Sequence, residues 1–128
     1  MAIKVYIDQG HNPVNPNAGA EGNGLREQNL VYEIGRELAS LLRANGNFEV
    51  RLSRPTPQTQ LGNSTSSSLR IRVNEANSWG ADYFISLHTN AAESSAATGS
   101  EGFAFSRPSA AFSLGQDILR EMTEITGL

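Results

Sequence analysis

The fold is decided by the stretch Ala81–Leu87, which is written ADYFISL and runs directly into His88. Its aromatic and β-branched residues predict a strand that is buried on both faces. A second run of this kind, Ile3–Ile7 (IKVYI), begins the chain and leads into a loop at Asp8. Strands of this type are typical of a parallel sheet covered by helices, so we expect an α/β fold.

The segments between and after these two strands alternate in type. Apolar residues recur at helical spacing in three regions, and two further segments have the character of strands. The predicted helices are 25–45, 69–80 and 111–128, and the additional predicted strands are 48–52 and 102–105. The resulting order βαβαββα predicts a three-layer sandwich with a mixed, mostly parallel sheet flanked by helices.

Three connecting segments are predicted to lack regular structure. Residues 10–24 are rich in Gly, Asn and Pro, and a long ordered loop of this composition is more often functional than not. Residues 53–68 contain almost no apolar side chains, and we expect a mobile, solvated connection there. Residues 91–100 form a loop of small residues.

Composition excludes several classes of protein. The 128 residues include no Cys, only ten Lys and Arg, and a net charge of −3. A disulfide scaffold and a Cys-based zinc site are therefore excluded, and nucleic-acid binding is disfavoured. No run of about 18 apolar residues is present to span a membrane, and the N-terminus lacks a signal-peptide pattern. We expect one domain, residues 1–128, that is monomeric.

The two histidines of the chain, His11 and His88, each follow the carboxyl end of a predicted strand. Ligand sites in open α/β sheets collect at this edge. A single histidine there is more often a structural hydrogen bonder, and that alternative stays open for each of them. Two histidines placed alike by separate parts of the chain favour a shared ligand.

Glu27 lies in the first turn of the predicted helix 25–45. By helical periodicity it shares a face with Leu30, Val31 and Ile34, so we expect its carboxylate to point toward the core. The helix N-terminus would stabilise the charge by about 0.3–1 kcal/mol, which is small against the several kcal/mol that burial of an ion costs. Glu27 could instead cap backbone N–H groups of its own helix, but a cation shared with both histidines explains all three placements.

Two imidazole nitrogens and one carboxylate oxygen suit catalytic zinc, which takes three protein ligands and leaves a fourth position for water. Such an ion would lower the pKa of that water and polarise a substrate carbonyl, so hydrolysis of an amide or ester is expected. The sequence has no His-Glu-x-x-His helix, which excludes the common metalloprotease pattern.

Six segments resemble, in order and spacing, the zinc-dependent N-acetylmuramoyl-L-alanine amidases of the amidase_3 type. These segments are Ile7–His11, Gly22–Glu27, Arg51–Arg54, Arg72–Asn77, Ala81–Asn90 and Gly99–Gly102. The resemblance covers essentially the whole chain. It implies a zinc site made by His11, Glu27 and His88. It also implies hydrolysis of the bond between the muramic acid lactyl group and L-alanine in peptidoglycan, as in bacterial autolysins. The implied location is extracellular, in the cell wall or in the periplasm, or that of a sporulation or phage enzyme.

The chain departs from the family pattern in three places. Gln9 stands where the family usually has Pro, and Asn12–Asn17 replaces a Gly-rich stretch. The catalytic glutamate of the family belongs to a later Val-Glu-x-Gly-Phe segment, which is expected beyond Leu128. Glu101 matches a different segment and is not assigned as the general base. We therefore expect a shortened form of a longer enzyme, without the last strand and helix of the family fold.

Three further residues have assigned roles. Asn90, two residues beyond His88, is expected to contact substrate or to support a metal ligand. Arg72 is expected to form a structural ion pair, and Trp79 to close a helix against the sheet. Two alternatives to the amidase remain: a non-catalytic, zinc-containing fragment that binds peptidoglycan, and a zinc peptidase of another specificity.

Overall fold

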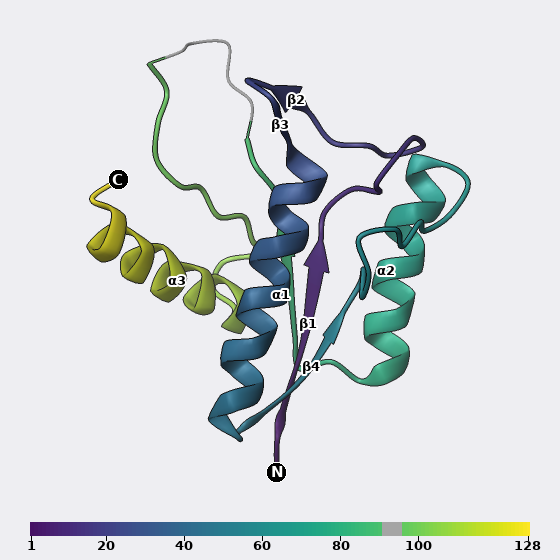
Figure 1. The fold of residues 1–128 in the computed structure, drawn as a ribbon. Helices are drawn as coiled ribbons and strands as arrows, with labels where there is room; N and C mark the ends of the chain where they lie inside the picture. The colour runs from purple at the N-terminus through teal and green to yellow at the C-terminus, as the bar shows by residue number, and fades with distance from the viewer. Residues whose placement is uncertain (91–95) are drawn as a thin grey trace. The chain divides into compact units, whose positions relative to one another are not determined.

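The central element of the fold is a parallel sheet in which the first strand of the chain lies in the middle (Figure 1). The computed structural model describes residues 1–90 and 96–128. Its elements in chain order are β1 Ile3–Gln9, β2 Glu21–Gly22, β3 Leu25–Arg26, α1 Glu27–Asn45, β4 Phe48–Leu52, α2 Thr65–Trp79, β5 Tyr83–Leu87 and α3 Ala110–Thr126. They belong to two units, Met1–Ala91 and Ala92–Leu128, which are described separately.

The sheet of the first unit has the order β4-β1-β5, and both pairings are parallel. In the register of these strands, Val5 pairs with Val50 and Ile7 pairs with Ile85. Because β1 has a neighbour on each side and a helix over each face, it is buried from Val5 to Gln9. The strands predicted at 3–7, 48–52 and 81–87 are therefore confirmed as β1, β4 and β5. The expected burial of the last one on both faces is wrong, since Phe84 of β5 is 41% exposed.

The two helices of this unit cover opposite faces of β1 (Figure 1). Val5 and Ile7 point to one face, where they form the apolar core with Ala39 of α1 and Val50 of β4. Alternate residues of a strand point to opposite faces, so Asp8 faces the other way, where it pairs with Arg72 of α2. The predicted three-layer α/β arrangement with mostly parallel strands is confirmed. The antiparallel part is the separate β2–β3 pair.

The start of α1 differs from the prediction. The helix begins at Glu27, because Leu25–Arg26 pairs with Glu21–Gly22 as an antiparallel hairpin. Asn23 and Gly24 form its turn with φ angles of 51° and 75°. An Asn-Gly pair tolerates these left-handed angles, which suits a two-residue hairpin. The first strand and the turn of the hairpin fall inside the segment 10–24 that is predicted to be irregular, and its second strand replaces the predicted start of the helix 25–45.

The buried face of α1 also differs from the prediction. Val31 is buried, but Leu30 and Ile34 are exposed. The face turned to the sheet instead carries small residues such as Gly35 and Ala39. Small side chains let the helix backbone approach the strands closely, and apolar periodicity does not report this.

The expectation of a solvated connection over 53–68 is wrong at both of its ends. Ser53 and Arg54 are buried directly after β4. At the other end, α2 already begins at Thr65, and Ser64 caps it by accepting a hydrogen bond from the backbone N–H of Ser67. These polar residues are ordered because they hydrogen-bond to backbone groups, which offsets the absence of apolar burial.

The second unit contains α3 and the segment before it. Ser109 caps α3 by accepting a hydrogen bond from the N–H of Phe112, and Gly127 ends the helix with φ 74°. The strand predicted at 102–105 is wrong, since no described residue pairs with it in a ladder. The first half of the loop predicted at 91–100 lies outside the described residues. Among the described helices, none is both long and apolar enough to cross a bilayer.

Candidate metal centre

Three side chains that can bind a metal meet at the carboxyl edge of the sheet. His11 follows β1, His88 follows β5, and Glu27 is the first residue of α1. Because β1 and β5 are parallel neighbours, their carboxyl ends lie side by side. One ligand atom from each of the three residues lies within 4.8 Å of the other two. The structure therefore brings together the three residues that the sequence singled out.

The donor atoms face one another closely. His11 Nε2 lies 3.2 Å from Glu27 Oε2, and His88 Nδ1 lies 3.5 Å from Glu27 Oε1. The two imidazole nitrogens are 3.2 Å apart, and the rings are nearly perpendicular at 84°. Two nitrogens and a carboxylate oxygen that converge in this way fit the donor set of a divalent cation such as zinc. His88 is 42% exposed and Glu27 only 6%, so the cluster is open on the side of His88.

Glu27 is held by backbone groups from outside its own helix. The N–H of Thr89 donates to Oε1 at 2.8 Å, and the N–H of Ala20 donates to Oε2 at 3.3 Å. Burial acts to raise the pKa of Glu27, but these two hydrogen bonds and the nearby His11 and His88 lower it below its ordinary value. The carboxylate is thus kept ionised. The alternative that Glu27 caps the N–H groups of α1 is not the arrangement seen, because its recorded donors are Thr89 and Ala20.

Two glycines make room for the cluster. A Cβ atom at Gly10 would stand 2.6 Å from Cε1 of His88, and one at Gly19 would stand 2.9 Å from Cβ of Glu27. Both distances are shorter than real carbon contacts, so any side chain at these positions would displace a donor residue.

His11 has an unusual backbone conformation. Its φ angle is 68°, in the left-handed region that costs a non-glycine residue about 1–3 kcal/mol. Its ring atom Nδ1 is buried and has no hydrogen-bond partner among the described residues. Histidines that bind metals usually donate this second ring N–H to a neighbour that fixes the ring. The orientation of His11 therefore depends on how its backbone is held.

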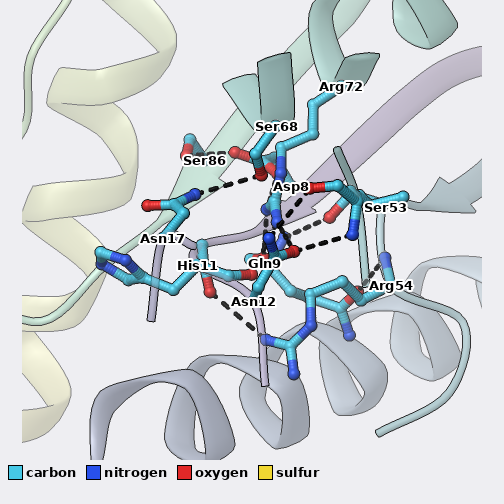
Figure 2. A network of polar contacts seen from close by, with 12 residues as sticks. Asp8, Gln9, His11, Asn12, Asn17, Ser53, Arg54, Ser68, Arg72 and Ser86 are labelled. Atoms are coloured by element: carbon cyan, nitrogen blue, oxygen red, sulfur yellow. Dashed lines mark hydrogen bonds and ion pairs between the residues drawn. The ribbon is translucent and has the colours of Figure 1, made fainter. Parts of the chain in front are cut away.

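A buried arginine of α2 holds that backbone (Figure 2). Arg72 Nη1 donates to Asp8 Oδ1 at 2.8 Å and to the carbonyl of Gln9 at 2.7 Å. Its Nη2 donates to the carbonyl of His11 at 2.6 Å and to Asn12 Oδ1 at 3.2 Å. The ion pair predicted for Arg72 is confirmed, and the same guanidinium group holds the carbonyl of His11.

The sequence did not indicate the role of Arg54, although it lies in a segment that carries the family resemblance. Its side chain is fully buried and stacks over the ring of Tyr32 at 5.6 Å. Nη1 donates to the carbonyls of Gly10 at 3.3 Å and Gln28 at 2.9 Å. Burial, together with the charge of Arg72, lowers the pKa of Arg54.

Gln9 is a second buried polar residue whose role was missed. Its Nε2 donates to the carbonyl of Tyr32, and its Oε1 accepts from the N–H of Arg54, both at 2.9 Å. Its backbone N–H donates to Ser53 Oγ at 2.9 Å. The side chain fits because position 35 is glycine, where a Cβ atom would lie 2.5 Å from Gln9 Cγ. Gln9 thus joins β1, α1 and the segment after β4.

Asn12, the residue after His11, is fully buried and uses its whole amide. Its Nδ2 donates to the carbonyls of Pro16 and Leu61, and its Oδ1 accepts from the N–H of Leu61 as well as from Arg72. Asn12 therefore ties the loop after β1 to the segment before α2.

Three other residues that the sequence singled out are Asn90, Trp79 and Glu101. Asn90 is exposed two residues beyond His88. Trp79 lies at the opposite end of β5, where Lys4 and Arg51 stand over its ring at 5.5 and 5.0 Å. These contacts place Trp79 against β1 and β4, in agreement with its predicted role at the end of a helix. Glu101 belongs to the second unit.

Two imidazoles and a carboxylate at the carboxyl edge of a parallel sheet form a donor set that metal-dependent hydrolases use. Residues 5–128 match the model of the Amidase_3 family, described as N-acetylmuramoyl-L-alanine amidase. The chain belongs to this family.

Relatives of known name agree with the family match. The chain is 38% identical over 120 residues to the N-acetylmuramoyl-L-alanine amidase CwlM of Bacillus licheniformis, covering 93% of this chain and 43% of that protein. It is also 38% identical over 104 residues to a sporulation-specific N-acetylmuramoyl-L-alanine amidase of Bacillus subtilis, covering 80% of this chain and 36% of that protein.

A solved structure shows the same fold. The catalytic domain of CwlV, an N-acetylmuramoyl-L-alanine amidase from Bacillus (Paenibacillus) polymyxa var. colistinus, matches with a TM-score of 0.63 and 31% identity. The match covers 76% of this chain and 50% of that one. The chain therefore spans half or less of the length of these three proteins.

Proposed function

We propose that residues 1–128 supply the zinc-binding part of an N-acetylmuramoyl-L-alanine amidase. The single observation that carries the proposal is the convergence of His11, Glu27 and His88 within 4.8 Å in a chain of the Amidase_3 family. The proposed ligand atoms are His11 Nε2, His88 Nδ1 and a carboxylate oxygen of Glu27. The proposed substrate is the amide bond between the muramic acid lactyl group and L-alanine in peptidoglycan.

A bound zinc ion would supply Lewis acidity, which polarises a substrate carbonyl and makes water more acidic. The chain's own residues prepare the site for that ion. The N–H groups of Thr89 and Ala20 keep Glu27 ionised, and Gly10 leaves space for the ring of His88. The exposure of His88 leaves one side of the cluster open to a large polymeric substrate.

The reaction adds water across the amide. The carbonyl carbon gains an oxygen, its bond to the L-alanine nitrogen breaks, and that nitrogen leaves as a free amine after it takes up a proton. A carboxylate that carries this proton would contribute about 10²- to 10⁴-fold to the rate. We assign that role to a glutamate outside residues 1–128, as the family resemblance implies, and not to Glu101.

Asn90 is proposed to contact the substrate, since it is exposed two residues beyond His88. The proposed partner is the peptidoglycan strand with its stem peptide. The proposed place of action is outside the cell, in the cell wall or in the periplasm, or in a sporulating cell or during phage lysis. The names of the relatives support this range, since one is sporulation-specific and another is an endolysin of Bacillus phage SPP1.

The first test is metal content. The chain is purified without chelator, and bound zinc is measured for the unchanged protein and for His11→Ala, Glu27→Gln and His88→Ala. We expect one zinc ion per unchanged chain and none in the three variants. Glu37→Gln, an exposed position on α1, is the matched control and should bind zinc normally. A chain without stoichiometric zinc would refute the metal site.

The second test is turnover. The 128-residue chain and a C-terminally extended form of it are incubated with peptidoglycan, and newly exposed L-alanine amino groups are measured. Activity confined to the extended form supports the assignment of the proton carrier. Binding of zinc and peptidoglycan without release of amino groups in either form would favour the binding fragment. Cleavage of a stem peptide that lacks muramic acid would favour a peptidase.

A further inference from the structure

Three consecutive carbonyl groups at the end of β1 are held by two buried guanidinium groups (Figure 2). The carbonyls of Gln9 and His11 accept from Arg72, and the carbonyl of Gly10 accepts from Arg54. We propose that Arg54 and Arg72 are positioning residues that fix the backbone of His11 so that its Nε2 faces Glu27 and His88. This inference rests on the proposed function, because it concerns the same cation.

His11 needs such support from its backbone. Its φ of 68° lies in the left-handed region, which only a few per cent of non-glycine residues adopt. The ring has no second hydrogen bond to fix it, because Nδ1 is without a partner among the described residues. A rotation of the His11 peptide would therefore swing Nε2 away from Glu27, with no hydrogen bond between Nδ1 and a described residue to resist it.

Arg72 restrains that rotation by hydrogen-bonding to the backbone of the loop. Its two terminal nitrogens reach the carbonyls on either side of Gly10, at 2.7 Å for Gln9 and 2.6 Å for His11. The side chain is 1% exposed, and Asp8 at 2.8 Å balances its charge. Ser86 of β5 donates to the other oxygen of Asp8 at 2.7 Å, so the arginine is itself anchored to the sheet.

Arg54 couples two of the proposed ligands to each other. Its Nη1 carries two hydrogens, and these reach the carbonyls of Gly10 and Gln28. Gly10 precedes His11 and Gln28 follows Glu27. One nitrogen therefore fixes the distance between the backbone segments that carry the imidazole and the carboxylate.

The contacts of Arg72 require a guanidinium group because they come from two nitrogens, whereas both contacts of Arg54 come from one. Arginine presents five N–H donors in a rigid plane, whereas lysine has one nitrogen at the end of a flexible chain. A lysine at position 72 keeps the charge beside Asp8, but a single nitrogen does not span the carbonyls of Gln9 and His11. Replacement by lysine therefore separates the positioning role from the role of the charge.

The test compares Arg72→Lys with Arg70→Lys, and it compares Arg54→Met, which removes the shared donor nitrogen, with Arg70→Met. Arg70 is an exposed arginine on α2 whose Nη2 donates to Ser66 Oγ of the same helix, so it serves as the matched control. The zinc dissociation constant is measured under conditions where each protein is folded, and the free energy of unfolding is measured without metal. We expect zinc binding to weaken about 10- to 100-fold in both test variants and to stay unchanged in the controls. The visible spectrum of bound Co²⁺ should also change in the test variants, since it reports the geometry of the ligands.

Two results would overturn the inference. The first is zinc affinity and a Co²⁺ spectrum that are unchanged in folded Arg54→Met and Arg72→Lys, even where stability falls, because the arginines would then serve the fold alone. If these variants do not fold, nitrogen NMR of the metal-free, unchanged chain decides. The inference is supported if the two Nη groups of Arg54 and of Arg72 rotate slowly and give separate signals, while those of Arg70 give one averaged signal. Averaged signals from all three arginines overturn the inference. Failure of the unchanged chain to bind zinc would instead refute the proposed function itself.

Discussion

Gly10 lies against the ring of His88 so closely that a Cβ atom at position 10 would stand 2.6 Å from Cε1 of that ring. The same atom would stand 2.6 Å from the carbonyl oxygen of Leu87, to which the Gly10 N–H already donates at 3.1 Å. The missing side chain lets the loop after β1 pass close to the end of β5. The two proposed histidine ligands are brought together by this approach.

Gly10→Ala should therefore damage both the fold and the proposed metal site. We expect a loss of about 1–3 kcal/mol in the free energy of unfolding, as for overpacking in a core. We also expect zinc binding to weaken about 10-fold or more, because His88 must move. Gly22→Ala is the control, since a Cβ atom there meets nothing within 4 Å. Equal zinc affinity in the two variants would contradict the structural argument.

Gln9→Leu tests the buried amide that joins β1 to α1. Leucine is similar in size but leaves the N–H of Arg54 without its acceptor at 2.9 Å. A buried group left unsatisfied costs about 1–3 kcal/mol, so we expect a loss of that size in chemical unfolding. Gln58→Leu, at an exposed position, should change stability little. A loss no larger than that of Gln58→Leu would show that the amide contributes nothing.

Tyr6→Phe tests a buried phenol on the α2 face of the sheet. Burial, together with the negative charges of Glu75 and Asp8, raises the pKa of Tyr6 above its ordinary value of about 10. Above that pH the unfolded chain loses the phenol proton before the folded chain does. The free energy of unfolding should therefore fall as the pH rises beyond about 10. In Tyr6→Phe this fall should be shallower, as measured by urea unfolding from pH 8 to 11, with Tyr83→Phe as the control. An equal slope in the unchanged chain and Tyr6→Phe would contradict the assignment.

Removal of metal should lower stability in a way that depends on Glu27. Zinc at 100 times its dissociation constant raises the free energy of unfolding by about 2.7 kcal/mol if it binds only the folded state. We expect a chelator to remove this increment from the unchanged chain and to have no effect on Glu27→Gln. A chelator effect of the same size in Glu27→Gln would place the bound ion elsewhere.

Much of the sheet could be predicted because its strands are short, apolar runs. The runs at Ile3–Ile7, Phe48–Leu52 and Ala81–Leu87 correspond to β1, β4 and β5. The meeting of His11 and His88 followed from the parallel arrangement, since residues after adjacent parallel strands lie at the same edge. These features depend on local patterns and on a general rule of topology.

The supports of the site could not be predicted in the same way. Arg54 and Gln9 are polar, so nothing in their local sequence indicates that they are buried, and their hydrogen bond spans 45 residues of the chain. The buried face of α1 differs from the prediction because it also packs against a polar side chain. Leu30 and Ile34 are exposed, while Gly35 is turned inward to receive Gln9. Apolar periodicity predicts which helix face is buried against apolar side chains. It does not predict the buried face of a helix that packs against a polar side chain such as the amide of Gln9.

The central position of β1 has a consequence for the order of events during folding. Both neighbours of β1, Phe48–Leu52 and Tyr83–Leu87, follow it in the sequence, so it waits for both before its edges are paired. Contacts between residues far apart in sequence form slowly, because a long loop must close first. His11 and His88 are separated by 77 positions, so a growing chain cannot complete the site before His88 has been made. A half-made polypeptide would thus hold an imidazole and a carboxylate but no finished cation site, which delays metal uptake until the sheet has closed.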